Sequence, residues 1–299
     1  MTNKNDKKLV FRGAATALVT PFRDGAVNYA ELERLLEFQI ENGIDAVVVC
    51  ATTGEAPTLE DGEHQRIIEF AAETVNGRIP VIAGTGSNNT GHAVKMSVEA
   101  QKNGADALLC VTPYYNRATD EGLVRSFTAI ADAVDIPVIL YNVPSRTAVS
   151  ISRSVYARLA GHPNIVGVKD ASGNIAEAAA LASECGDRLA IYSGNDDMTV
   201  PILSLGGAGV ISVLSNIAPK AVSSICSAWF TGDRDTARGL QLKYMPLIRA
   251  LFSEVNPIPV KTALAAMGFD TGEFRLPLCE MNPRAADVLY AEMSRAGII

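Results

Sequence analysis

The sequence lacks a long apolar run, an excess of positive charge and an N-terminal leader pattern. No stretch of about 18 consecutive apolar residues occurs in its 299 residues, which argues against a transmembrane helix. Its 26 Lys and Arg against 33 Asp and Glu give a net charge of −7, which disfavours nucleic acid and anionic membranes as partners. The polar start MTNKNDKK has no following apolar segment, so we find no secretory signal.

Cysteine and histidine are also sparse. The five cysteines show no C-x-x-C spacing, and Cys50 and Cys110 each end an apolar run. We therefore expect buried free thiols rather than disulfides, which points to a reducing cytoplasm. The three histidines have no spacing typical of metal ligands, so we expect no metal site.

The sequence does contain an alternation of short apolar runs and amphipathic helical patterns. The apolar runs are mostly continuous, as is typical of parallel strands that are covered on both faces. A weak internal repeat (NGIDAVVV, NGADALLC, GGAGVISV) joins a glycine-containing turn to three of them. Eight such runs occur, at residues 14–20, 45–50, 80–85, 105–112, 136–142, 164–170, 189–194 and 208–213.

This alternation predicts a (β/α)8 barrel of the TIM type. A doubly wound open sheet is the main alternative, but the segment GTGSNNTG lacks the G-x-G-x-x-G spacing of a dinucleotide site. Only helical patterns remain after residue 216. We therefore expect the barrel, with the active site, in residues 1–232 and a helical C-terminal extension in residues 233–299.

In such barrels the active site lies at the carboxyl ends of the strands, and Lys169 stands at one of these ends. An amine that is partly desolvated there favours its neutral form and can attack a carbonyl to form a Schiff base. A lysine that only pairs with Asp170 or another nearby acid is the alternative. Lys261, in the segment NPIPVK, is a competing nucleophile, but we expect it in the first turn of a C-terminal helix with a structural role.

Other strand ends supply hydroxyl groups and a second cation. Tyr141 precedes Lys169 by one strand and can carry protons to and from an amine, or it can simply fill the barrel top. Arg146 follows Pro144 and can bind a carboxylate with two hydrogen bonds, or it can be a solvated surface residue. The remaining polar candidates at strand ends include Thr52, Thr53, Glu55, Thr85, Thr112, Tyr114, Tyr115, Asn142, Ser193, Gly194, Asn195, Asp196 and Ser212.

Seven segments in unbroken order resemble the dihydrodipicolinate synthase / N-acetylneuraminate lyase family, over roughly residues 12–299. They are ATTGE (51–55), TPYYNR (112–117), YNVPSRT (141–147), GVKDASG (167–173), SGNDD (193–197), GGAGVISV (206–213) and NPIPVK (256–261). The resemblance to its synthase branch implies a lyase that condenses pyruvate with L-aspartate 4-semialdehyde in lysine (diaminopimelate) biosynthesis. It implies no cofactor beyond the covalent pyruvate Schiff base, and a homotetramer.

The resemblance also implies roles for individual residues. Lys169 would form the Schiff base, Tyr141 would donate and accept protons, and Thr52 and Tyr115 would complete its relay, with Tyr115 reaching in from a neighbouring subunit. The substrate-binding residues would be Thr53, Gly194 and the backbone at Ile211 for pyruvate, and Arg146 for the semialdehyde carboxylate.

Two positions depart from the pattern of lysine-inhibited family members. Those members carry two histidines after T-T-G-E and an acid after G-T-G, whereas this chain has Asp61 at the first histidine position and His92 at the acid position. His64, Asn88 and Tyr114 match the pattern. Because a histidine is a poor partner for an ammonium ion, we expect weak or absent inhibition by lysine.

Two other functions remain open from the sequence. A sugar-acid lyase of the same superfamily, such as N-acetylneuraminate lyase, would share the lysine but would generally lack an arginine at position 146. A barrel that only binds small molecules would lack Lys169 or Tyr141, and this chain has both.

Overall fold

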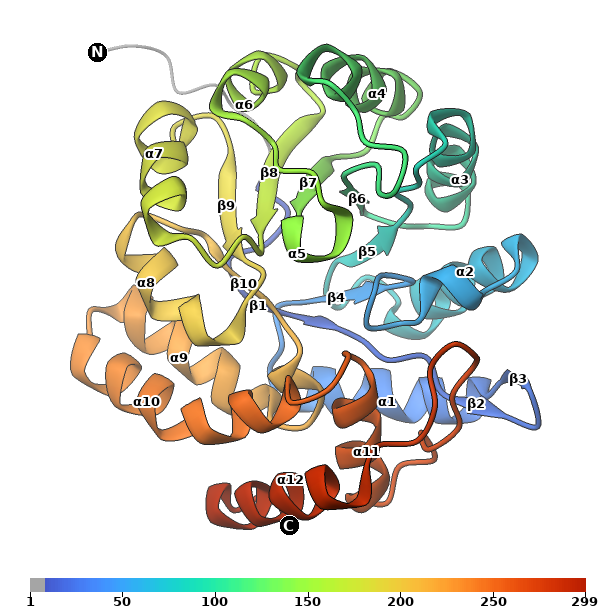
Figure 1. The fold of residues 1–299 in the computed structure, drawn as a ribbon, viewed down its shortest axis with the longest axis vertical. Helices are drawn as coiled ribbons and strands as arrows, with labels where there is room; N and C mark the ends of the chain where they lie inside the picture. Colours follow the sequence, from blue (N-terminus) through green and yellow to red (C-terminus); the bar gives the residue numbers. More distant parts are fainter. Residues whose placement is uncertain (1–8) are drawn as a thin grey trace.

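The computed structural model describes residues 9–299 and contains a closed barrel of eight parallel strands (Figure 1). The predicted (β/α)8 fold is therefore confirmed. Residues 1–8 lie outside the described residues. They include the start of the predicted barrel range and the segment for which we expect no secretory signal. Around the barrel the strands follow the order β1 (Gly13–Ala17), β10 (Gly209–Ser212), β9 (Ala190–Ser193), β8 (Ile165–Asp170), β7 (Val138–Asn142), β6 (Ala107–Val111), β5 (Val81–Gly84) and β4 (Ala46–Val49).

Helices surround this barrel and cover the outer faces of its strands (Figure 1). Their apolar faces pack on the strands, so both faces of each strand are buried, as the continuous apolar runs predicted. The covering helices are α1 (Tyr29–Glu41), α2 (Asp61–Val75), α3 (Thr90–Lys102), α4 (Asp120–Asp132), α6 (Arg153–Leu159), α7 (Ile175–Cys185), α8 (Thr199–Ser204) and α9 (Pro219–Thr231).

Side chains fill the inside of the barrel. An apolar cluster includes Val48, Ile82, Leu109 and Ile139 from successive strands. Tyr192 closes part of this interior and donates a hydrogen bond from its hydroxyl to the Phe11 carbonyl at 2.8 Å. Because the interior is packed, chemistry is confined to the ends of the barrel.

Short elements at the strand ends were not predicted from the sequence. A two-stranded hairpin, β2 (Phe22–Arg23) with β3 (Ala26–Val27), follows the first barrel strand. Single turns of helix follow four other barrel strands: η1 (Ala56–Thr58) after β4, α5 (Pro144–Thr147) after β7, η2 (Asp196–Met198) after β9 and η3 (Leu214–Asn216) after β10. Such turns are too short for periodicity to reveal.

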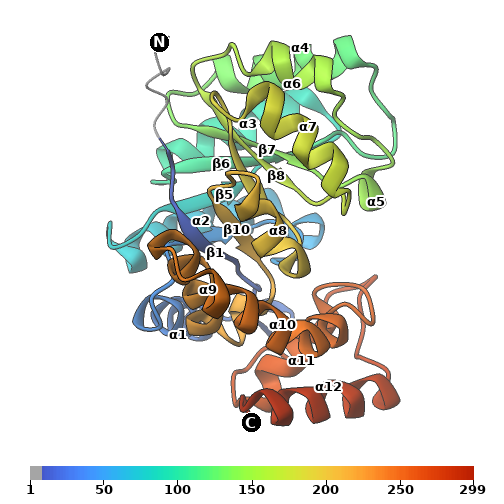
Figure 2. The same cartoon turned by 90° about the vertical axis from the view of Figure 1, so that its left-hand side faces the viewer.

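The C-terminal extension consists of α10 (Arg234–Leu251), α11 (Ile258–Ala266) and α12 (Pro283–Ala296). Figures 1 and 2 show α11 and α12 together at one end of the molecule, where α12 packs against α10 and α11. Gly232 ends α9 in a left-handed conformation (φ 95°), and the Asp233 side chain accepts a hydrogen bond from the backbone of Thr236 to start α10. We therefore propose Asp233 as the start of the extension.

Four of the five cysteines are buried free thiols, as predicted, and Cys279 is exposed. In the part of the chain that the structure describes, no helix is long and apolar enough to cross a membrane.

Candidate active site

Lys169 lies near the carboxyl end of β8, directly opposite Tyr141 of β7 in the parallel register. Its side chain is buried (5% exposed), and its Nζ lies 4.3 Å from the centre of the Tyr141 ring. The Asp170 carboxylate instead accepts hydrogen bonds from Asn142 Nδ2 at 3.2 Å and Ser172 Oγ at 3.0 Å. Within residues 9–299, Lys169 forms no ion pair, so the alternative of a lysine paired with Asp170 is not what the structure contains.

A buried carboxylate, Asp196, connects the ends of β9 and β10. Its Oδ1 accepts a hydrogen bond from Ser212 Oγ at 2.5 Å, and its Oδ2 accepts from the backbone N–H groups of Val213 and Leu214 at 3.0 and 2.9 Å. Burial raises the pKa of Asp196, while these donors and the charge of Lys169 act in the opposite direction. The carboxylate thus fixes two strand ends on the side of the barrel next to Lys169.

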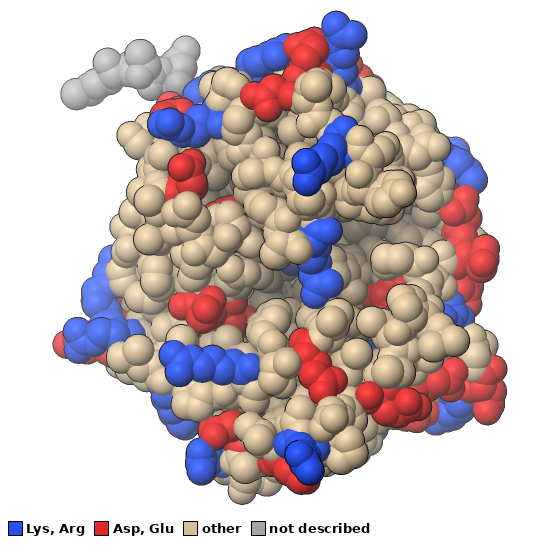
Figure 3. All heavy atoms as spheres, in the orientation of Figure 1, with Lys and Arg blue, Asp and Glu red and all other residues tan. Residues whose placement is uncertain are grey.

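A cavity of about 390 Å³ opens over the ends of β4 to β7. Its walls include Thr52, Tyr114, Tyr141 and Arg146, which come from three different strand-end loops. Figure 3 shows a hollow near the centre of this face, with atoms of Lys or Arg at its edge. The cavity therefore brings together Thr52, Tyr141 and Arg146, to which the family resemblance gives roles, and Lys169 lies against Tyr141.

The other residues to which the resemblance gives roles do not line this cavity. Thr53 is buried (3% exposed), and Ile211 faces the barrel interior in β10. Gly194 follows β9, where a Cβ would lie 2.7 Å from that of Ala171, so the close approach requires glycine. Tyr115 has a left-handed backbone (φ 70°) and is 93% exposed, and it does not line the cavity of this chain.

Asn256, which sequence reasoning did not select, contacts two of the predicted residues. Its side-chain Nδ2 donates to Thr53 Oγ1 at 2.9 Å, and its backbone carbonyl accepts from Arg146 Nη2 at 3.3 Å. The segment NPIPVK, which begins with Asn256, contributed to the family resemblance. No chemical pattern marks a single asparagine as part of a site, so this residue is not predictable from the segment alone.

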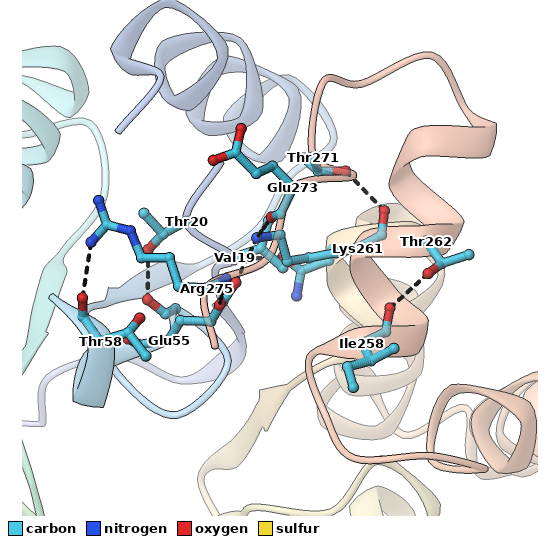
Figure 4. A network of polar contacts seen from close by, with 12 residues as sticks. Val19, Thr20, Glu55, Thr58, Ile258, Lys261, Thr262, Thr271, Glu273 and Arg275 are labelled. Atoms are coloured by element: carbon cyan, nitrogen blue, oxygen red, sulfur yellow. Dashed lines mark hydrogen bonds and ion pairs between the residues drawn. The ribbon is translucent and has the colours of Figure 1, made fainter. Parts of the chain in front are cut away.

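Lys261 lies in the first turn of α11 and is fully buried, in line with the structural role expected for it. Its Nζ donates to Glu55 Oε1 at 2.5 Å and to the Glu273 carbonyl at 2.6 Å. Arg275 adds a backbone N–H to Glu55 Oε2 at 3.3 Å and reaches the Thr58 carbonyl at 2.9 Å. Figure 4 shows how these groups from the extension converge on the loop after β4.

Asp61, which lines the cavity, is hydrogen-bonded to two neighbouring side chains. Its carboxylate accepts hydrogen bonds from His92 Nε2 at 3.0 Å and Lys95 Nζ at 2.8 Å. These two hydrogen bonds lower the pKa of Asp61 to about 2. His64 is buried, and its Nε2 donates to the Gly84 carbonyl at 2.8 Å. The two positions that depart from the lysine-inhibited pattern are therefore bonded to each other.

Among the described residues, no three His, Cys, Asp or Glu side chains are grouped so that they could hold a metal ion.

Comparisons with known proteins agree on one family. The family model for the dihydrodipicolinate synthetase family matches residues 10–296. A 4-hydroxy-tetrahydrodipicolinate synthase of Thermoanaerobacter sp. (strain X514) is 52% identical over 97% of this chain and 98% of its own length. One from Geobacter sulfurreducens is 53% identical over 97% of this chain and 100% of its own length. A crystal structure of the Acinetobacter baumannii dihydrodipicolinate synthase with pyruvate superposes with a TM-score of 0.94 at 45% identity, covering 96% of this chain and 99% of that one.

The chain belongs to the dihydrodipicolinate synthetase family. The predicted family, the enzyme class (a lyase) and the reaction of lysine biosynthesis implied by the resemblance are therefore confirmed.

We predict that Lys261→Met destabilises the protein by about 3–5 kcal/mol, because it leaves the Glu55 carboxylate buried without its partner. Urea unfolding followed by circular dichroism measures the change. The double variant Glu55→Gln/Lys261→Met should recover part of the loss, since the unpaired charge is then gone.

Lys102→Met is the matched control, because Lys102 forms an exposed ion pair with Glu99 at 2.8 Å that solvent screens. A loss in Lys261→Met no larger than in Lys102→Met would contradict the role of the buried pair.

Proposed function

We propose that Lys169 is the nucleophile of this enzyme and forms a Schiff base with pyruvate. The observation that carries the proposal is a buried amine that lies against Tyr141 at the carboxyl end of the barrel. Within residues 9–299 it forms no ion pair with a carboxylate. A lysine amine is the nucleophile that forms a Schiff base with a carbonyl substrate. Apolar side chains fill the barrel interior below Lys169, so a substrate would reach the amine from the side of the cavity.

The chemistry then follows in balanced steps. The Lys169 nitrogen adds to the carbonyl carbon of pyruvate, and loss of water from the carbinolamine leaves an iminium ion. The iminium withdraws electrons from the methyl carbon, which loses a proton to give an enamine. That carbon attacks the aldehyde carbon of L-aspartate 4-semialdehyde, and the aldehyde oxygen takes up a proton. The substrate's own amine can then displace the lysine and close the ring.

Each of these steps moves a proton, and Tyr141 is the proposed carrier. It lies beside Lys169 and also lines the cavity, so it adjoins the proposed nucleophile and the space that the second substrate would fill. Thr52 lines the same cavity and would continue the relay toward Tyr115. The almost complete exposure of Tyr115 in a single chain supports a position in the active site of a neighbouring subunit.

The carboxylates of the two substrates would be bound by different residues. We assign pyruvate to the Thr53 hydroxyl, Gly194 and the backbone at Ile211. We assign the semialdehyde carboxylate to Arg146, whose guanidinium is exposed at the cavity wall and held on one side by the Asn256 carbonyl.

The proposal needs no metal or organic cofactor, since the lysine itself supplies the electron sink. It includes a homotetramer and a cytoplasmic location, the latter supported by the four buried free cysteines.

Removing the amine tests the assignment. Lys169→Met should abolish the condensation, and Tyr141→Phe should lower kcat by about 10²–10⁴ fold, the usual contribution of a proton carrier. A continuous assay with both substrates measures this. Lys220→Met, which removes an exposed lysine of α9, should retain wild-type turnover. Turnover by Lys169→Met close to that of Lys220→Met would refute the proposed nucleophile.

We further predict that L-lysine inhibits this enzyme weakly or not at all. The Asp61 carboxylate is engaged by His92 and Lys95, and His92 replaces the acid that would pair with the amine of lysine. Turnover should therefore persist when lysine is titrated to millimolar concentration. Strong inhibition at micromolar lysine would show that this interpretation of the two positions is wrong.

A further inference from the structure

The extension contacts the loop after β4 at two adjacent places. Asn256 bonds Thr53, and five residues further on Lys261 bonds Glu55, two residues after Thr53. The second contact is a fully buried ion pair, shown in Figure 4, which fixes this loop against α11. The first contact therefore forms between two segments that are already held in place.

The Asn256–Thr53 hydrogen bond has a defined direction. The amide Nδ2 can only donate, so the Thr53 hydroxyl oxygen accepts and its own proton remains available. Within residues 9–299, no protein acceptor takes that proton. A Thr53 hydroxyl held this way can donate to a substrate carboxylate, whereas a free hydroxyl would rotate among several partners.

Asn256 also contacts the proposed site of the second carboxylate. Its backbone carbonyl accepts from Arg146 Nη2 at 3.3 Å, so the same residue adjoins the residues assigned to both substrates. The side-chain Oδ1 is buried and has no partner in the described residues. The donation to Thr53 is therefore the one side-chain hydrogen bond that replacing Asn256 by alanine removes, and the backbone contact to Arg146 is kept.

We propose that the Asn256 side chain is a positioning residue that presents the Thr53 hydroxyl as a donor to the pyruvate carboxylate. This inference rests on the proposed function, in which Thr53 binds pyruvate. It means that the C-terminal extension completes the substrate site, although the barrel carries the reacting groups.

The test is steady-state kinetics of Asn256→Ala with each substrate varied in turn. KM for pyruvate should rise about tenfold, the effect of one lost hydrogen bond, while kcat and KM for the semialdehyde change less than threefold. Asn256→Asp, which keeps the shape but replaces the donor with an acceptor, should raise KM for pyruvate at least as much. An Asn256→Asp enzyme with wild-type KM would overturn the proposal.

Double variants separate positioning from a general structural role. In a Thr53→Val background, which has no hydroxyl, Asn256→Ala should raise KM for pyruvate no further. In a Thr53→Ser background, which keeps the hydroxyl, it should still raise KM about tenfold. Additive effects in the Thr53→Val background would overturn the proposal, because Asn256 would then act through something other than Thr53.

Asn282→Ala is the matched control. Asn282 is an exposed asparagine of the same extension, and its side chain caps α12 by accepting from the backbone of Arg284. Its replacement should lower the melting temperature without changing KM for pyruvate. A rise in KM equal to that of Asn256→Ala would overturn the specific role of Asn256.

An inactive wild-type enzyme would contradict the proposed function itself, whereas an active wild type with unchanged KM in Asn256→Ala would overturn only this inference.

Discussion

The parallel pairing of β7 with β8 is the interaction on which the site depends. It sets Tyr141 opposite Lys169, and the next pair in register is Asn142 with Asp170. Asn142 Nδ2 donates to the Asp170 carboxylate, and within residues 9–299 Lys169 forms no ion pair with that acid. This register therefore places the Tyr141 ring next to the Lys169 amine and places Asn142 next to the Asp170 carboxylate.

The packed barrel interior closes one side of the candidate site, and the cavity over the strand ends leaves the other side open. Apolar side chains fill the interior, and Asp196 bonds the ends of β9 and β10 beside Lys169. The cavity over β4 to β7 provides the remaining direction of approach. From outside the barrel, the extension contacts the loop after β4 through a buried ion pair and an asparagine. The proposed reacting groups thus come from the strand ends, and the loop after β4 is bonded to residues more than 200 positions away in sequence.

The sequence was sufficient to predict the barrel, its eight strands and the helices at its C-terminal end, because continuous apolar runs and helical periodicity are local signals. Lys169 was found because a cation at the end of an apolar run is unusual. The contact of Asn256 with Thr53 could not be predicted, because it joins two segments that are distant in sequence and no local pattern records it. The occupation of Asp61 by His92 and Lys95 was also not visible, because it depends on how α2 and α3 face each other.

The most direct test of the central claim is chemical trapping. The protein is incubated with pyruvate and sodium borohydride, which reduces an iminium to a stable amine, and the modified peptide is located by mass spectrometry. We predict a single pyruvate adduct at Lys169. The absence of an adduct, or an adduct confined to Lys261, would contradict the assignment of Lys169 as the nucleophile.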